Sequence, residues 1–146
     1  MSTDRSVTKH LMETLENGRL GYEKAAEKLS NEAPELLRML QDAASQRAGM
    51  YQELDVIASR YGDDLDEKST VGGAVHRGWM AVKDAFTGDS AEAILNAAAT
   101  GEDYAIEQYE EAISNAISPE FRPVLERQLQ HVRSARAALD SFRKTA

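Results

Sequence analysis

The sequence predicts an all-α protein, built as a bundle of four long helices. Three observations indicate this class. Apolar residues recur at steps of three and four over four long segments, which is the spacing of one buried helix face. No alternating apolar and polar run of strand length occurs. The chain of 146 residues suits one domain over 1–146 with a single hydrophobic core.

The first half predicts two helices separated by a short break. The first helix spans about 6–30, and its apolar stripe is Val7, Leu11, Leu15, Gly18, Tyr22, Ala25 and Leu29. Pro34 suits the first turn of a second helix over about 34–61, because the N–H that proline lacks is not needed there. This helix carries Leu37, Leu40, Ala44, Arg47, Tyr51, Leu54, Ala58 and Tyr61. Gly62 is a typical residue to end it.

The connecting segment 62–89 differs from the rest of the chain. It opens with the charged run Asp63, Asp64, Asp66, Glu67 and Lys68, which predicts a solvated loop. Thr70 can cap a shorter helix over about 70–87. The apolar residues of this shorter helix are Val71, Val75, Trp79, Val82 and Phe86.

The second half again predicts two long helices. Ser90 is a candidate cap for a helix over about 90–116, with the stripe Leu95, Ala98, Glu102, Ala105, Tyr109, Ala112 and Ala116. Ser118 and Pro119 resemble a cap and first-turn pair for a helix over about 119–143. The stripe expected there is Phe121, Val124, Gln128, His131, Ala135, Ala138 and Phe142.

The lengths of the connections predict the topology. The breaks within each half are short, and short loops force neighbouring helices to be antiparallel. The segment 62–89 is long enough to run the length of a bundle. Two antiparallel hairpins joined by one long crossover, containing a short helix, is the ferritin-like arrangement rather than a simple up-and-down bundle.

Composition excludes several classes of function. The chain has 17 basic and 25 acidic residues and a net charge of −8, which disfavours binding to nucleic acid or to anionic membranes. It has no cysteine, so thiol catalysis and thiolate metal sites are excluded. No run of about 18 apolar residues is present, and no membrane span is expected. We expect a cytoplasmic protein that needs no cofactor.

Four polar residues lie in phase with the apolar stripes, near the middle of the long helices. They are Arg47, Glu102, Gln128 and His131. Antiparallel helices bring their midpoints together, so these side chains are predicted to meet in one buried polar core cluster. A bundle would hold a metal site at this place, but an arginine is not a metal ligand.

Two motifs resemble those of rubrerythrin-type ferritin-like proteins. The segment 101–109, Gly-Glu-Asp-Tyr-Ala-Ile-Glu-Gln-Tyr, looks like their metal-ligand helix, and 128–131, Gln-Leu-Gln-His, is similar to their Glu-x-x-His. The resemblance implies a di-metal site with six ligand positions. Arg19 follows Gly18 at a position where the family pattern has glutamate. Ala44 and Arg47 occupy the positions where the pattern has its other Glu-x-x-His pair. Only Glu102 and His131 remain as vestigial metal candidates.

A further set of motifs resembles a bacterial family of ferritin-like four-helix-bundle proteins of unknown function. The matching residues are Gly21-Tyr22, Arg47, Glu53-Leu54, Gly73-x-x-His76-Arg77-x-Trp79, Gly101-Glu102-Asp103 and Tyr109. This resemblance implies the fold and leaves the activity open.

The interpretation that we favour is a non-catalytic bundle in which Arg47 pairs with Glu102 and fills the place of a metal. A buried arginine needs an anion or hydrogen bonds, because an unpaired buried charge costs several kcal/mol. One alternative is that Arg47 lies at the edge of its stripe and reaches solvent. Another is a di-iron or di-manganese oxidase or iron-binding protein that uses Glu102 and His131 with Glu23 or Glu107.

A second candidate site lies in the crossover. His76, Arg77 and Trp79 form an aromatic and basic patch, which can be read as a ligand pocket or as a packing anchor for the short helix. The protein is expected to have a structural role or to bind another protein, either a second copy of itself as a homodimer or a different partner.

Overall fold

The computed structural model of the chain describes residues 2–29, 33–59, 91–115 and 117–145. The predicted short helix over 70–87 lies outside the described residues. The crossover patch of His76, Arg77 and Trp79 lies there too, so its role stays a prediction.

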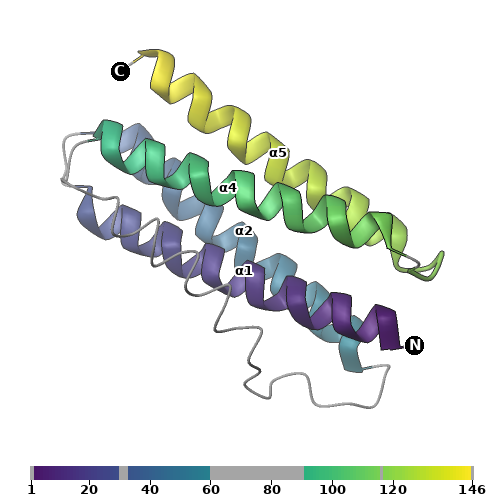
Figure 1. The fold of residues 1–146 in the computed structure, drawn as a ribbon. Coiled ribbons are helices and arrows are strands. Elements are labelled where there is room, and N and C mark those ends of the chain that lie inside the picture. The colour runs from purple at the N-terminus through teal and green to yellow at the C-terminus, as the bar shows by residue number, and fades with distance from the viewer. Residues whose placement is uncertain (1, 30–32, 60–90, 116, 146) are drawn as a thin grey trace.

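The described residues form four helices that lie along one long axis (Figure 1). The first hairpin consists of α1 (Ser2–Lys28) and α2 (Pro34–Ser59), and the second consists of α4 (Ala91–Ser114) and α5 (Arg122–Thr145). The helices of each hairpin are antiparallel, whereas α2 and α4 run in the same direction, so Ser59 and Ala91 lie at opposite ends of the bundle (Figure 1). The predicted all-α four-helix bundle is confirmed for the described residues.

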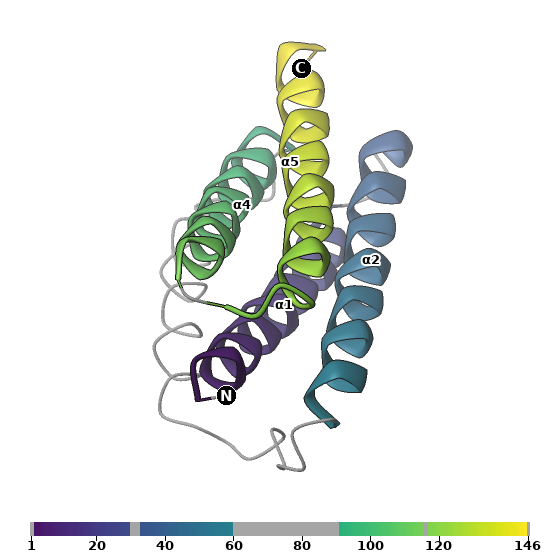
Figure 2. The same ribbon diagram turned by 90° about the vertical axis from the view of Figure 1, so that its right-hand side faces the viewer.

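The helix α1 packs against two neighbouring helices, one from each hairpin. It contacts both α2 and α4, and Figure 2 shows it between the other helices when the bundle is viewed near its end. Every residue of its predicted apolar stripe is buried. The phase predicted for α1 from the spacing of apolar residues is therefore confirmed.

The apolar core is divided into two clusters along the bundle axis. One is built around Leu15, Met50, Tyr109 and Leu125, among other residues. The other is built around Tyr22, Leu40, Leu95 and Leu139. The polar residues Arg47 and Glu102 fall between the two clusters, because each lies between residues of both clusters along its own helix. The candidate site is thus placed at the middle of the core.

The start of α5 differs from the prediction. Ser118 and Pro119 precede the helix, which begins at Arg122. The backbone N–H groups of Phe121 and Arg122 both donate to the Ser118 carbonyl, at 3.1 and 3.2 Å, and form a turn. The Ser118 amide donates to the Asp4 carboxylate at 3.0 Å. A tertiary contact with α1 therefore sets the position of this turn, which sequence spacing does not reveal.

None of the helices in the described part of the chain combines the length and the hydropathy that crossing a bilayer requires.

Candidate functional site

The centre of the bundle holds an ion pair between α2 and α4. The Arg47 guanidinium donates through Nη2 to Oε2 of Glu102. Both residues lie midway along their helices. Their side chains are only 2% and 3% exposed, so water screens the pair very little. This pair is the central feature of the core.

Two residues of α1 form the wall against which Arg47 packs. A Cβ atom built on Gly18 would lie 3.7 Å from Cγ and 3.8 Å from Cδ of Arg47. These are ordinary van der Waals distances, so the arginine stem packs directly against α1 at Gly18. The guanidinium carbon of Arg47 lies 5.6 Å from the centroid of the Tyr22 ring, a cation–π contact that stabilises the buried charge.

The charges of the pair depend on one another. Burial is the largest single effect and lowers the pKa of Arg47, but the raising effects of Glu102 and its neighbours together outweigh burial, and this pKa lies above its ordinary value. Burial also raises the pKa of Glu102, an effect that the Arg47 charge opposes. Burial raises the pKa of the Tyr22 hydroxyl, which the Glu102 charge raises further. Tyr22 is therefore a protonated O–H group at neutral pH.

Gln128 occupies a second polar cluster, beside the ion pair. It is fully buried, and its carbonyl oxygen accepts a hydrogen bond of 2.6 Å from the Tyr109 hydroxyl. Its amide nitrogen donates to Glu53 at 2.8 Å and to the Met50 carbonyl at 3.3 Å. Glu53 in turn accepts from Arg127. The hydrogen-bonded chain thus leads from the core to the surface between α2 and α5.

Glu53 was not among the predicted cluster residues. Its side chain is one-third exposed, so it lies at the margin of the core and off the apolar stripe of α2. Its pKa is lowered, mainly because it accepts a hydrogen bond from Arg127. The sequence signal for Glu53 was its place in the Glu53-Leu54 pair of the family motif, which did not indicate that it contacts the core.

His131 was predicted to complete the buried cluster, and this prediction is wrong. His131 is exposed, and its Nδ1 lies 3.3 Å from Nε2 of Gln46 on the surface. The buried stripe of α5 passes from Gln128 to Val132, a step of four rather than three residues. One residue turns a helix by about 100°, so this change of step carries the imidazole out of the core.

The three other members of the predicted cluster are buried, but they do not all join one network. Arg47 bonds to Glu102, whereas Gln128 bonds to Tyr109 and Glu53. The Arg47 charge nevertheless lowers the pKa of Tyr109, against the larger raising effect of burial. The two clusters are therefore electrostatic neighbours without a shared hydrogen bond.

The residues present do not fit a di-metal centre. Such a site needs several carboxylate and imidazole ligands directed at one point. Among the described residues, no group of three or more His, Cys, Asp or Glu side chains converges in this way. Glu102 faces a guanidinium, and Glu23 pairs with Arg19 on the surface. The donor set is thus that of an ion pair.

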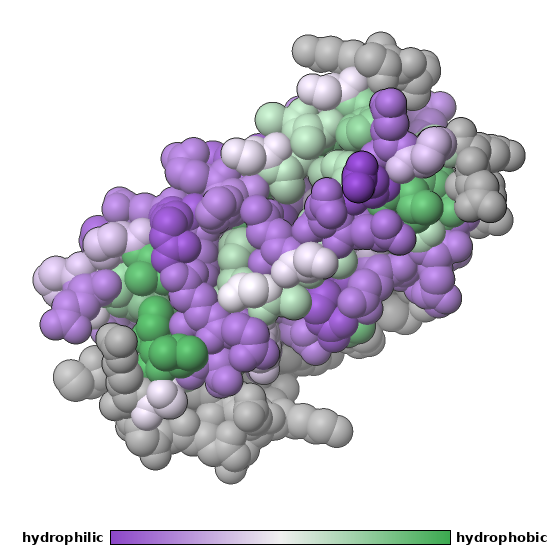
Figure 3. Space-filling model, turned by 180° about the vertical axis from the view of Figure 1, so that it is seen from behind, coloured by the Kyte–Doolittle hydropathy of each residue, from purple (hydrophilic) through white to green (hydrophobic). Residues whose placement is uncertain are grey.

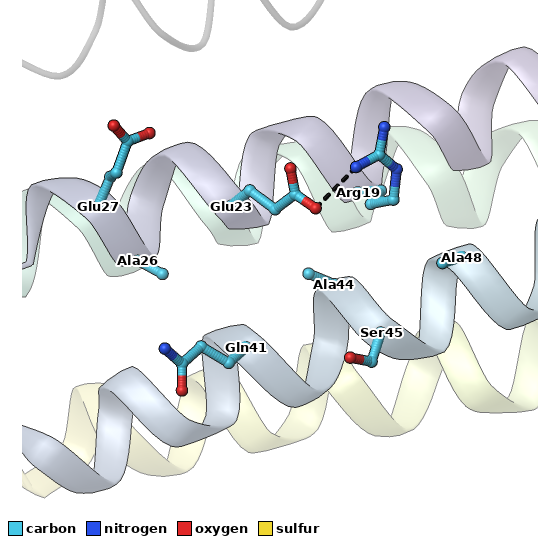
Figure 4. Close-up of a pocket in the computed structure, with 8 residues that line it drawn as sticks. All are labelled: Arg19, Glu23, Ala26, Glu27, Gln41, Ala44, Ser45 and Ala48. Atoms are coloured by element: carbon cyan, nitrogen blue, oxygen red, sulfur yellow. Dashed lines mark hydrogen bonds and ion pairs between the residues drawn. The ribbon is translucent and has the colours of Figure 1, made fainter.

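A groove between α1 and α2 lies beside the segments of these helices that carry Tyr22 and Arg47. It has a volume of about 710 Å3, and its lining includes Ala26, Ala44 and Ala48 together with Arg19 and Glu23. Figure 4 shows Ala26 and Ala44 projecting into the space between the helices, with the Arg19–Glu23 pair on the α1 side. Small side chains keep this part of the helix–helix contact open.

Comparison with known proteins identifies a family. The model of the family described as "Domain of unknown function (DUF2383)" matches residues 6–115, which include Arg47 and Glu102. A search of curated proteins gave no significant match. The match covers most of the chain, and the chain therefore belongs to this family of unknown function.

Proposed function

We propose that this protein is a non-catalytic bundle of ferritin-like type, in which the Arg47–Glu102 pair takes the position that a di-metal centre has in metal-binding bundles. The observation that carries the proposal is the burial of the guanidinium at the bundle centre, bonded to Glu102. A fixed cation there supplies the positive charge that a carboxylate in the core needs. It also repels free metal cations.

The direction of α2 and α4 supports the ferritin-like part of the proposal. These helices run in parallel, as a long crossover between two hairpins requires (Figure 1). The residue types at the expected ligand positions support the other part of the proposal, that the ion pair takes the place of a di-metal centre. Ala44 and Arg47 lie at one pair of positions, and neither residue type binds a metal ion in proteins.

A di-iron or di-manganese oxidase, or an iron-binding protein, is the competing function. It would require Glu102 to share ligands with His131 and with acids such as Glu23 or Glu107. His131, Glu23 and Glu107 are all exposed, whereas Glu102 is buried. The geometry therefore favours the non-catalytic bundle.

Metal analysis tests the proposal. Protein purified without chelator is measured by inductively coupled plasma mass spectrometry, before and after incubation with Fe²⁺ and Mn²⁺ under anaerobic conditions. We expect less than about 0.1 metal ion per chain. About two ions per chain, the content of a di-metal site, would overturn the proposal. The Glu102→Gln variant is the control, because retention of ions by this variant would place them outside the bundle centre.

We further propose that the bundle acts in the cytoplasm by binding another protein, either a second copy of itself as a homodimer or a different partner. The face seen from behind in Figure 1 is mainly hydrophilic, and its hydrophobic areas are separate (Figure 3). Among the described residues, the large exposed apolar side chains are Leu20 and Val56. Multi-angle light scattering of the purified protein distinguishes a homodimer from a monomer that needs a different partner. A mass of twice 16.1 kDa indicates the homodimer.

A further inference from the structure

The Arg47–Glu102 pair uses only part of the hydrogen-bonding capacity of the arginine. A guanidinium has five N–H donors, and the contact with Glu102 is made through Nη2. The Nε and Nη1 atoms of Arg47 are buried and have no hydrogen-bond partner among the described residues. The Tyr22 hydroxyl likewise makes no hydrogen bond of ordinary geometry there, although it lies close enough to Glu102 to lower the pKa of that carboxyl. Both side chains are almost completely buried, at 2% exposure for Arg47 and 1% for Tyr22.

These unpartnered groups lie in one place. The guanidinium stands over the Tyr22 ring, and the Tyr22 hydroxyl is close enough to Glu102 and Arg47 for both charges to affect its pKa. Arg47 can only donate hydrogen bonds, and the Tyr22 hydroxyl is protonated. Together they offer donors from α1 and α2 to a single small acceptor. Buried polar groups in folded proteins almost always have a partner.

We propose that Arg47 and Tyr22 bind an internal water molecule at the centre of the bundle. Buried water characteristically bonds two to four otherwise unsatisfied polar groups. An uncharged acceptor suits this site better than an anion, because Glu102 already neutralises Arg47. The acidic residues Glu23 and Glu27 at the groove also disfavour anions.

The groove between α1 and α2 lies beside the segments of these helices that carry both donor residues. Ala44, which lines the groove, precedes Arg47 by about one turn of α2, and Ala26 follows Tyr22 by about one turn of α1. Both project into the space between the helices (Figure 4). These two groove-lining residues therefore lie within about one helical turn, roughly 5 Å along the helix axis, of the donor residues. The proposal does not depend on the relation of the bundle to metal proteins.

The test uses nuclear magnetic resonance of the full-length protein labelled with ¹⁵N. Water–protein cross-peaks to the Arg47 Nε–H group are recorded in laboratory-frame and rotating-frame experiments. A bound water with a long residence time gives cross-peaks of opposite sign in the two experiments. We expect this result for the wild-type protein and for Tyr109→Phe, and its loss in Tyr22→Phe.

Tyr109→Phe is the matched control. It removes a hydroxyl from the same core, but that hydroxyl already donates to Gln128 at 2.6 Å. Absence of the cross-peaks in the wild-type protein would overturn the proposal. Cross-peaks of equal intensity in Tyr22→Phe would overturn the role of Tyr22 in the site.

Thermal unfolding provides an independent readout. Tyr22→Phe is expected to lower the Tm, because it removes a bond to the bound water. An increase in Tm would show that the hydroxyl is unsatisfied in the native protein, and would overturn the proposal. A rise in the Tm of the wild-type protein with sodium nitrate or sodium formate at constant ionic strength, absent in Tyr22→Phe, would assign the site to an oxyanion instead of water.

Discussion

Glu102→Gln is the most direct perturbation of the bundle centre. It keeps the shape of the side chain but removes the charge that balances Arg47. The pair is 2% and 3% exposed, so solvent cannot replace the lost carboxylate. Breaking a buried pair by removal of one partner costs about 3–5 kcal/mol. We therefore expect a loss of this size in the free energy of unfolding, with a decrease in Tm of about 10–15 °C.

The assay is urea unfolding at pH 7, followed by circular dichroism at 222 nm. Glu110→Gln is the matched control, because it makes the same chemical change on the same helix. Glu110 pairs with Arg133 on the surface, where the two side chains are 53% and 44% exposed. An exposed pair contributes below about 1 kcal/mol. Equal losses in the two variants would refute the argument that the central pair is buried and unscreened.

The double variant Arg47→Met/Glu102→Leu completes the experiment. It replaces both charges by apolar side chains of similar size, so neither is left unpaired. Such replacements are often neutral or stabilising by about 1–4 kcal/mol. We expect the double variant to be more stable than Glu102→Gln. The two residues are not coupled if the double variant loses as much free energy of unfolding as Arg47→Met and Glu102→Leu lose together.

Three further predictions concern residues around the centre. Gly49→Ala should stabilise the protein by about 0.5–1 kcal/mol in urea unfolding, because Gly49 is an exposed interior residue of α2 with nothing within 4 Å of the added Cβ; a loss of stability would contradict this. Tyr109→Phe should cost about 1–3 kcal/mol, since it leaves the buried Gln128 carbonyl without its donor; an unchanged urea midpoint would count against the bond. Arg127 lowers the pKa of Glu53, so the stability that this carboxylate contributes is present above its ordinary pKa of 4.5 and is lost as the pH falls through the lowered pKa. Glu53→Gln should therefore reduce the loss of stability between pH 5 and about pH 3, measured by thermal unfolding, and an unchanged pH profile would exclude the contribution.

The polar centre was predictable in part because its residues interrupt regular apolar stripes. Arg47 and Glu102 lie at positions where every other member of the stripe is apolar or small, so burial of both charges followed from helix periodicity. Helices of similar length that pack side by side have their midpoints at one level of the bundle, and Arg47 and Glu102 lie at the midpoints of the parallel helices α2 and α4. The pairing therefore rests on two regularities that a sequence shows directly.

The position of His131 was not predictable in this way. After Gln128, a step of three residues leads to His131 and a step of four leads to Val132, and both steps are normal for a buried helix face. The stripe through Val132 and Leu139 is the more apolar one, and packing against the other helices selects it. A preference for the more apolar stripe would have placed His131 on the surface.

The sequence alone determined four amphipathic helices, their grouping into two antiparallel hairpins and the presence of charge at the centre, because these depend on residue spacing and loop length. Only the tertiary structure decided which polar atoms meet. The angle of each helix about its own axis, the contact of Arg47 with Gly18 and the unpartnered donors of Arg47 and Tyr22 depend on contacts between segments far apart in the chain. No local pattern records them, since each is set by the packing of several helices at once.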